Sequence, residues 1–460
     1  MLLSPEKIYA LRGQTILGVN PPVLDFAWFD LWAKPAGLLN VLGFLRSRGN
    51  RVHLLDLIYE GRTKPAGSGR WKVARERLEK PAALEGVPRH FHRFGLGPLE
   101  FAERLADLPK PDIILVTSIM TYWYLGVFET IDILKQRYPK VPVILGGIYA
   151  LLCPDHAARS GADFILSAGG PDLPFVPTPL DLYAGPERRS TPTRPGRQGF
   201  AAASTEPAPS GAPGYAIVST SSGCPRRCAY CASALITPRF RPKPLEDIYA
   251  DLAHQMSLGS VTDLAFYDDA LLWDKDSRFH PLCRHIRERY PRLRLHTPNG
   301  LSVDELDRRT CDTLRRTGFT TLRLSLEGLD QSTNSAGHGK TSRDNFCRAV
   351  DNLLAAGYNP ADLETYLLAG LPGQRPEDVE RSIEFVKSIG GRPKLCEFSP
   401  IPGTRLFQQA AETSPVILEE PLWHNNTVYG PYLSPDLPPD VLQRLKNSLA
   451  ADNIYTGCRK

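Results

Sequence analysis

Three cysteines on one short segment are the residues of this sequence best placed to do chemistry. Cys224, Cys228 and Cys231 stand in SSGCPRRCAYCAS (221–233) with C-x3-C-x2-C spacing. Three thiolates on one loop can each ligate a different iron of a cubane cluster, which leaves a fourth iron open to a substrate. The alternatives are a zinc site or incidental cysteines. Structural zinc usually takes four ligands, and no second cysteine pair follows at a suitable spacing.

The segment C-P-R-R-C-A-Y-C closely resembles the signature of radical S-adenosylmethionine (radical SAM) enzymes, in which an aromatic residue precedes the last cysteine. Tyr230 occupies that position. The resemblance implies a [4Fe–4S] cluster on the three cysteines, with SAM chelated to the open iron. It also implies reductive cleavage of SAM to methionine and a 5′-deoxyadenosyl radical, with an external one-electron reductant such as flavodoxin or ferredoxin.

The same resemblance assigns SAM contacts to polar residues at the ends of expected strands. In RLSLEG (323–328), strand alternation puts Arg323, Ser325 and Glu327 on one face. A salt bridge between Arg323 and Glu327 is the alternative to a SAM contact there, as helix capping or a turn is for Asp268 and Asp269. The residues expected to bind SAM are Tyr230, Asp268, Asp269, Asn299, Ser325, Glu327 and Gly370.

The elements that must position these residues form a repeating pattern. From residue 214 onward, apolar strands alternate with amphipathic helices in six steps, and the polar loops gather at the carboxyl ends of the strands. This pattern predicts a partial (β/α)6 barrel over 214–420. A stretch rich in Pro, Gly, Ala and Ser at 183–213 is predicted to be a linker. The extension at 421–460 has no strong hydrophobic pattern. Its His424 is predicted to be either a catalytic base or a surface imidazole.

The N-terminal part, 1–182, also alternates strands and helices. Apolar runs at 15–20, 51–58, 111–119, 141–147 and 162–168 predict a parallel sheet covered on both faces, that is, a doubly wound, Rossmann-like domain. A polar, basic insertion at about 60–105 has weak periodicity. A doubly wound domain before a radical SAM barrel resembles the class of these enzymes that has a cobalamin (B12)-binding domain.

Two of the three turns that this cobalamin domain uses are present. The first is a Ser-containing turn after a middle strand, and the second is a Gly-Gly pair after the next strand. The D-x-H-x-x-G loop that supplies a histidine to cobalt is missing, so no His–cobalt bond is predicted. Aromatic residues beside the first turn could face a corrin or fill its space, so either bound cobalamin or a domain repurposed for substrate is consistent with the sequence. The candidate residues for cobalamin or substrate are Ser118, Met120, Tyr122, Trp123, Gly146 and Gly147.

Composition bears on the partners and the location of the protein. The 460 residues carry a net charge of +5 without a long basic run or an RNA-binding module, which argues against a nucleic-acid partner. No apolar stretch could cross a bilayer and no signal peptide is visible, so no membrane partner and a cytoplasmic location are expected. The odd count of nine cysteines argues against full disulfide pairing, and the six scattered ones are expected to be small buried apolar residues.

The leading hypothesis is therefore a radical SAM enzyme acting on a small organic molecule, with cobalamin-dependent methylation as the first candidate reaction. The alternatives are a cobalamin-independent radical rearrangement, oxidation or lyase reaction, a non-enzymatic iron–sulfur electron carrier, and RNA modification. An electron carrier would account for the cysteines but not for the SAM-type residues.

Overall fold

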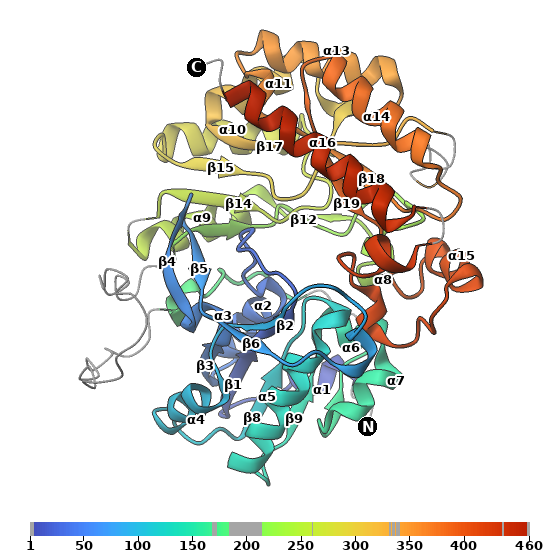
Figure 1. The fold of residues 1–460 in the computed structure, drawn as a ribbon. Helices are drawn as coiled ribbons and strands as arrows, with labels where there is room; N and C mark the ends of the chain where they lie inside the picture. Colours follow the sequence, from blue (N-terminus) through green and yellow to red (C-terminus); the bar gives the residue numbers. More distant parts are fainter. Residues whose placement is uncertain are drawn as a thin grey trace, which may run out of the picture.

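The computed structural model describes residues 4–167, 173–183, 214–259, 261–330, 333, 336, 341–434 and 437–457. The chain forms two α/β units, shown in blue to teal and in green to red in Figure 1. Nearly all of the predicted linker, 184–213, lies outside the described residues. Among the described helices, none has the length and apolarity needed to span a bilayer.

The N-terminal unit contains the predicted doubly wound sheet. Its five strands are parallel in the order β10-β9-β8-β1-β3. Their bounds are β1 Thr15–Asn20, β3 Arg51–Asp56, β8 Ile113–Val116, β9 Val143–Leu145 and β10 Phe164–Ile165. The strand order reverses between β1 and β8, and ligands usually bind at the carboxyl ends of the strands beside such a switch point.

Alternate side chains of this sheet are buried on opposite faces. Leu17 and Val19 of β1 pack in one apolar core with α4 (Pro98–Ala106) and α5 (Tyr124–Arg137). Ile16 packs in a second core with α1 (Pro5–Tyr9) and α2 (Ala36–Ser47). Burial on both faces explains why these strands read as uninterrupted apolar runs.

The insertion contains regular elements that its weak periodicity does not predict. β4 (Arg62–Gly67) and β5 (Arg70–Val73) form a hairpin. β6 (Arg75–Leu78) and β7 (Phe91–Phe94) join β2 (Val23–Asp25) in an antiparallel sheet. β4 has no buried residue, so no hydrophobic alternation marks it.

The C-terminal unit is the predicted partial barrel. Its parallel strands run in the order β11-β14-β15-β17-β18-β19, and β16 (Leu301–Ser302) pairs with β17. Their bounds are β11 Ala216–Val218, β14 Asp263–Phe266, β15 Arg294–His296, β17 Phe319–Glu327, β18 Leu363–Ala369 and β19 Arg392–Glu397. β11 and β19 stand at opposite ends of this order, so the described strands form an open barrel.

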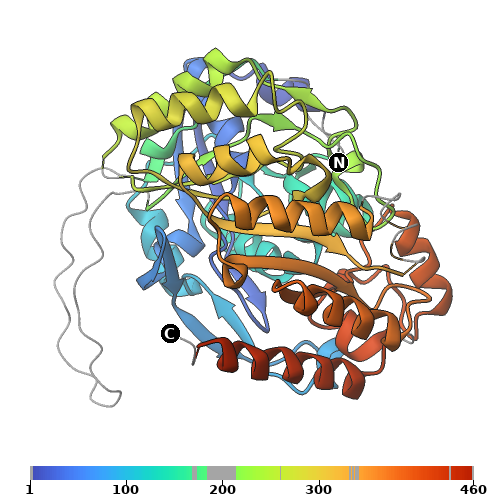
Figure 2. The same ribbon diagram turned by 90° about the horizontal axis from the view of Figure 1, so that it is seen from above.

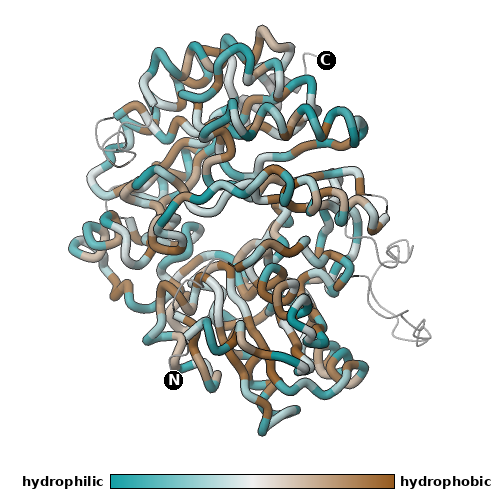
Figure 3. The backbone as a smooth tube through the Cα atoms, turned by 180° about the vertical axis from the view of Figure 1, so that it is seen from behind, coloured by the Kyte–Doolittle hydropathy of each residue, from teal (hydrophilic) through white to brown (hydrophobic). Residues whose placement is uncertain are grey.

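Helices cover the outer face of this barrel in an arc, and the C-terminal helix α16 closes the arc beside α14 (Figure 2). The outer helices alternate between polar and apolar residues along their length, as expected for helices with one buried face (Figure 3). The helix bounds are α9 Leu245–Ser257, α10 Phe279–Arg289, α11 Arg308–Thr317, α13 Arg343–Ala355, α14 Pro376–Ser388, α15 Arg405–Thr413 and α16 Pro439–Gly457.

The open side of the barrel packs on the N-terminal unit. Trp32, which follows β2, is 2% exposed and shares a core with Tyr215 and Ile217 of the barrel. Its ring stacks on His296 with the centroids 4.3 Å apart. The Lys34 ammonium lies 3.3 Å from the Tyr215 ring centroid, and burial lowers its pKa to about 7. This interface between units is therefore tightly packed.

The C-terminal extension also packs on the N-terminal unit. Leu422 and Val428 belong to the apolar core on the α5 side of the first sheet. His424 is 1% exposed, and its two ring nitrogens lie 2.9 Å from Thr121 Oγ1 and 2.7 Å from Leu418 O. The expectation of a surface imidazole is therefore wrong, because this side chain joins two distant parts of the chain.

Candidate functional site

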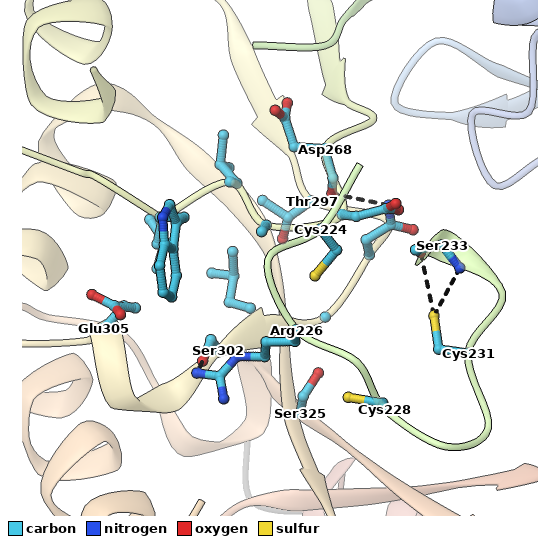
Figure 4. A pocket seen from close by; sticks show the side chains of 18 of the residues that line it. Cys224, Arg226, Cys228, Cys231, Ser233, Asp268, Thr297, Ser302, Glu305 and Ser325 are labelled. Atoms are coloured by element: carbon cyan, nitrogen blue, oxygen red, sulfur yellow. Dashed lines mark hydrogen bonds between the residues drawn. The ribbon is translucent and has the colours of Figure 1, made fainter. Parts of the chain in front are cut away.

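A cavity of about 190 Å³ opens at the carboxyl ends of the barrel strands, and the cysteine loop forms one wall (Figure 4). The structure brings nearly all of the predicted cluster and SAM residues to this one cavity. Those that line it are Cys224, Cys228, Tyr230, Cys231, Asp268, Asp269, Asn299, Ser325 and Glu327. The predicted Gly370 does not line it.

Backbone hydrogen bonds hold the cysteine loop in place. The loop leaves β12 (Ser221–Ser222) through Gly223, which has φ +74°, a backbone conformation that favours glycine. The N–H of Cys231 donates to Cys228 O at 3.1 Å, which makes a tight turn between two of the thiols. The N–H of Ala229 donates to Ala336 O at 2.7 Å, which ties the loop to the segment after β17.

The three thiols fit an iron–sulfur cluster better than a single metal ion. All three are half-buried and free of disulfides. Burial raises the pKa of the Cys224 thiol, and the nearby Asp269, Cys231 and Cys228 act in the same direction. Within the described ranges, no group of three His, Cys, Asp or Glu side chains is arranged to hold a metal ion. A cubane has no need of such convergence, because each thiolate binds a different iron.

Asp268 ties two strands together beside this loop. Its carboxylate is 4% exposed and accepts hydrogen bonds from the N–H of Thr220 at 2.9 Å, the Thr220 hydroxyl at 2.8 Å and the Ser221 hydroxyl at 2.6 Å. These donors lie between β11 and the cysteine loop. These contacts make Asp268 a positioning residue for the cysteine loop. Asp268 also lines the cavity, so its predicted contact with SAM stays a prediction.

Asp269 and Asn299 face the cavity more openly. Both side chains are exposed along its wall. Desolvation by the cavity walls raises the pKa of Asp269, and the neighbouring charge of Asp268 adds to this effect. Asn299 donates to the backbone oxygen of Asp268 at 3.0 Å, which leaves its amide oxygen as an acceptor toward the cavity.

The end of β17 supplies the opposite wall. Glu327 has φ +70°, an uncommon conformation for a residue with a side chain, and it accepts a hydrogen bond from the Tyr230 hydroxyl. Burial raises the pKa of Tyr230, so this hydroxyl stays protonated as the donor. Arg323 pairs with Glu364 on the next strand at 3.4 Å, and its guanidinium donates to Pro298 O at 3.1 Å.

Gly370 serves another region. It has φ +82° just after β18, and its N–H donates to Gln374 Oε1 at 2.9 Å. A Cβ placed on it would lie 3.5 Å from Ser434 Oγ. This distance is ordinary van der Waals contact, so the positive φ and not the lack of space is what favours glycine at position 370.

A second cavity of about 310 Å³ lies in the N-terminal unit, here called the N-terminal slot. Leu38 and Val41 of α2 line it, as do the carboxyl ends of β8 and β9 and the predicted Gly146 and Gly147. Gly147 has φ +88°, and a Cβ there would lie 2.5 Å from Ser118 O. The slot is mostly apolar and lies at the edge of the sheet where the switch-point rule places ligands.

The other predicted N-terminal residues lie in the adjoining turn and not in the slot. The Ser118 hydroxyl donates to Met120 O at 2.9 Å, which shapes the turn. Tyr122 is 7% exposed, and the Trp123 indole donates to Asp25 Oδ2 at 2.9 Å. The same carboxylate accepts from the Asn425 amide at 2.8 Å. The sequence does not predict that Asp25 joins these segments, because its partners Trp123 and Asn425 lie far away along the chain.

Sequence reasoning also missed Ile236. This residue ends α8 (Ser233–Ile236), the short helix after Cys231, and its side chain lines the N-terminal slot. The cysteine loop of one unit therefore adjoins the cavity of the other. The sequence carries no signal for this contact, because it depends on how the two units pack.

The scattered cysteines divide into two groups. Cys283 and Cys311 are buried as predicted, and burial raises the pKa of each thiol to about 12. Cys153, Cys347 and Cys396 are only partly buried. Cys458 lies outside the described residues.

Comparison with known proteins agrees with this geometry. The family model of the radical SAM superfamily matches residues 218–386. An uncharacterized methyltransferase of Pyrococcus horikoshii is 22% identical over 354 residues, which cover 70% of this chain and 74% of that protein. The ribosomal protein uS12 methylthiotransferase RimO of a Hydrogenobaculum species is 23% identical, over 42% of this chain and 49% of its own length.

Solved structures resemble the whole chain in fold. The radical SAM methyltransferase TsrM of Kitasatospora setae, with cobalamin and a [4Fe–4S] cluster bound, matches with a TM-score of 0.58 and 16% identity, over 87% of this chain and 75% of that one. The cobalamin-dependent SAM radical enzyme OxsB matches with a TM-score of 0.50 and 12% identity, over 88% and 55%. The protein is therefore an enzyme of the radical SAM class, with an N-terminal domain that has the fold of its cobalamin-dependent members.

Proposed function

We propose that Cys224, Cys228 and Cys231 hold a [4Fe–4S] cluster, and that the enzyme methylates a small organic substrate with the help of cobalamin bound in the N-terminal slot. When bound, the cluster supplies the electron that cleaves SAM to methionine and a 5′-deoxyadenosyl radical. When bound, cobalamin supplies a transferable methyl group. The observation that carries the proposal is the position of Ile236, which joins the cysteine loop to the slot.

The residues of the first cavity suit SAM. Asp269 and the amide oxygen of Asn299 offer acceptors to the SAM ammonium group, and both are exposed to the cavity. Ser325 and Glu327 supply a hydroxyl and a carboxylate for the ribose and methionyl groups. Tyr230 fixes the Glu327 carboxylate through its hydroxyl.

The N-terminal slot suits the aromatic base at the end of a cobalamin's nucleotide tail. Gly146 and Gly147 line the slot without side chains, and the slot walls are mostly apolar. The segment after β1, residues 21–34, contains no histidine, so no protein imidazole from it would ligate cobalt. The similarity to a methyltransferase by sequence, and to TsrM by fold, supports a methyl transfer.

The unit boundaries belong to the same proposal. We assign the cobalamin-type domain to 1–182, the linker to 183–213, the radical SAM barrel to 214–420 and the extension to 421–460. Tyr183, the first residue of the assigned linker, is buried, and its hydroxyl donates to Asp56 Oδ2 at 2.8 Å. The linker is thus anchored at its start. A cytoplasmic location and an external one-electron donor remain predictions.

The radical-initiation step is tested with the anaerobically reconstituted protein and dithionite. Wild-type protein is expected to bind about four irons and to release 5′-deoxyadenosine from SAM. Cys231→Ala is expected to lose this product, because the loop then offers two ligands. Cys283→Ala, a buried cysteine away from the loop, is the matched control and should retain it. Product formation by the Cys231 variant would refute the assignment.

The cobalamin part is tested separately. Wild-type protein incubated with hydroxocobalamin and gel-filtered should retain about one corrin. With SAM and dithionite, which reduces the cobalt so that it can accept a methyl group, it should also form S-adenosylhomocysteine. Ile148→Trp would fill the slot and abolish corrin retention without loss of 5′-deoxyadenosine. Leu99→Trp, at a position 83% exposed, is the control. Wild-type protein that cleaves SAM but retains no corrin would point to a cobalamin-independent radical reaction.

A further inference from the structure

The cysteine loop and the strand that returns beside it carry an unusual charge. Residues 221–243, here called the basic strap, contain Arg226, Arg227, Arg239, Arg241 and Lys243 and no acidic residue. Their formal charge of +5 equals the net charge of the whole chain. The rest of the sequence is therefore neutral overall, and the strap places a local excess of positive charge beside the cluster loop.

The fold brings both halves of the strap together. Ser222 of β12 pairs with Arg241 of β13 (Arg241–Pro242) in an antiparallel ladder. A Cβ on Gly223 would lie 2.9 Å from Arg239 O, so the returning strand lies directly against the start of the cysteine loop. The Arg227 guanidinium donates to Pro238 O at 3.4 Å, which links the loop to this strand.

The strap has an inner and an outer side. Arg226 points inward, where it lines the SAM cavity and donates to Ser302 Oγ at 2.9 Å. Arg227, Arg239 and Arg241 are exposed and line neither cavity of the site. Leu235, four residues after Cys231, is 41% exposed and adds apolar surface. Cationic side chains around a small apolar area are what an acidic protein partner of modest contact area would recognise.

We propose that the outer side of the basic strap is the docking surface for a small acidic electron-carrier protein, which reduces the cluster. This proposal rests on the proposed function, because it needs a cluster on the three cysteines. SAM would occupy the cavity side of the loop and Ile236 faces the N-terminal slot, so the side with the exposed arginines is the approach left to a protein partner. The reduced flavin or iron–sulfur carrier loses one electron, and the cluster gains it. No atom is transferred.

Binding is measured first, without turnover. The probe is an oxidised, acidic bacterial flavodoxin, titrated calorimetrically into the reconstituted enzyme. Wild-type affinity should fall at least about tenfold when NaCl is raised from 50 to 500 mM, because screening weakens exposed charge pairs. Arg239→Glu/Arg241→Glu, at two exposed positions outside the cysteine loop, should weaken binding about tenfold or more at 50 mM NaCl. Arg239→Gln, a milder change, should weaken it about threefold.

The matched control is Arg284→Glu/Arg287→Glu on the exposed side of α10, which changes the net charge by the same amount away from the strap. It should change the dissociation constant by less than about twofold. SAM cleavage driven by dithionite should be equal in all variants, while cleavage driven by reduced flavodoxin should fall with the binding loss. Failure of dithionite-driven SAM cleavage in wild-type protein would count against the proposed function. The flavodoxin titrations would still test the docking surface, because they need no turnover.

Three outcomes would overturn the docking surface. The first is equal flavodoxin binding by wild-type protein and the double variant. The second is an equal loss of binding in the Arg284 and Arg287 control. The third is tighter, salt-dependent binding of a single-stranded RNA 20-mer that the double variant loses, which would identify the strap as an RNA surface.

Discussion

Removal of the Asp268 carboxylate is expected to loosen the cysteine loop and not merely to weaken SAM binding. The carboxylate is 4% exposed and accepts from the N–H and hydroxyl of Thr220 and from the hydroxyl of Ser221. In Asp268→Ala the Thr220 N–H would be a buried donor without an acceptor, which costs about 1–3 kcal/mol. The two lost charged hydrogen bonds add about 1 kcal/mol each, since the hydroxyls can rotate.

The expected loss for Asp268→Ala is therefore about 3–5 kcal/mol of the free energy of unfolding of this region. Asp268→Asn keeps one acceptor oxygen, so its loss should be about half as large. The assay combines urea unfolding, hydrogen exchange of peptides over 214–233 and iron content after reconstitution. Exchange should accelerate in 214–233, and iron content should fall.

Asp276→Asn is the matched control. This carboxylate is 71% exposed and pairs with Arg309, so its loss should change stability by less than about 1 kcal/mol. The reasoning would be refuted if Asp268→Asn kept its iron content, its exchange rates and its unfolding curve but bound SAM more weakly. That pattern would make Asp268 a SAM ligand and remove it as a positioning residue.

Two further predictions concern the N-terminal unit. Burial lowers the pKa of His424 to about 4, whereas the unfolded value is about 6.5, so stability is full above pH 6.5 and falls as the pH drops toward 4. Urea unfolding should show about 2 kcal/mol less stability at pH 5 than at pH 7 from this group, and His424→Gln should remove that component; an unchanged difference would contradict it. Gly147→Ala should lower the thermal midpoint more than Gly373→Ala, because both glycines have positive φ but only Gly147 has a backbone oxygen 2.5 Å from the added Cβ. Equal midpoints for the two variants would show that this contact relaxes without cost.

Much of the site could be predicted from the sequence because it depends on local spacing. Cys224, Cys228 and Cys231 are close along the chain, so their spacing alone predicts a shared loop. The parallel strands carry Asp269, Asn299 and Glu327 to one edge because the carboxyl ends of parallel strands meet there. The apolar strands of both units were predictable because burial on both faces leaves continuous hydrophobic runs.

Only the tertiary structure decided which segments far apart in the sequence are in contact. Asp268 follows a strand like Asp269, and only the packing of β14 against β11 turns its carboxylate toward Thr220. His424 is buried because the extension folds back onto Thr121, about 300 residues earlier in the chain. Ile236 meets the N-terminal slot only because the two units pack together. Spacing determined the chemistry that the loop can support, since ligand geometry is local. The neighbours of that loop came from long-range contacts, which no local pattern encodes.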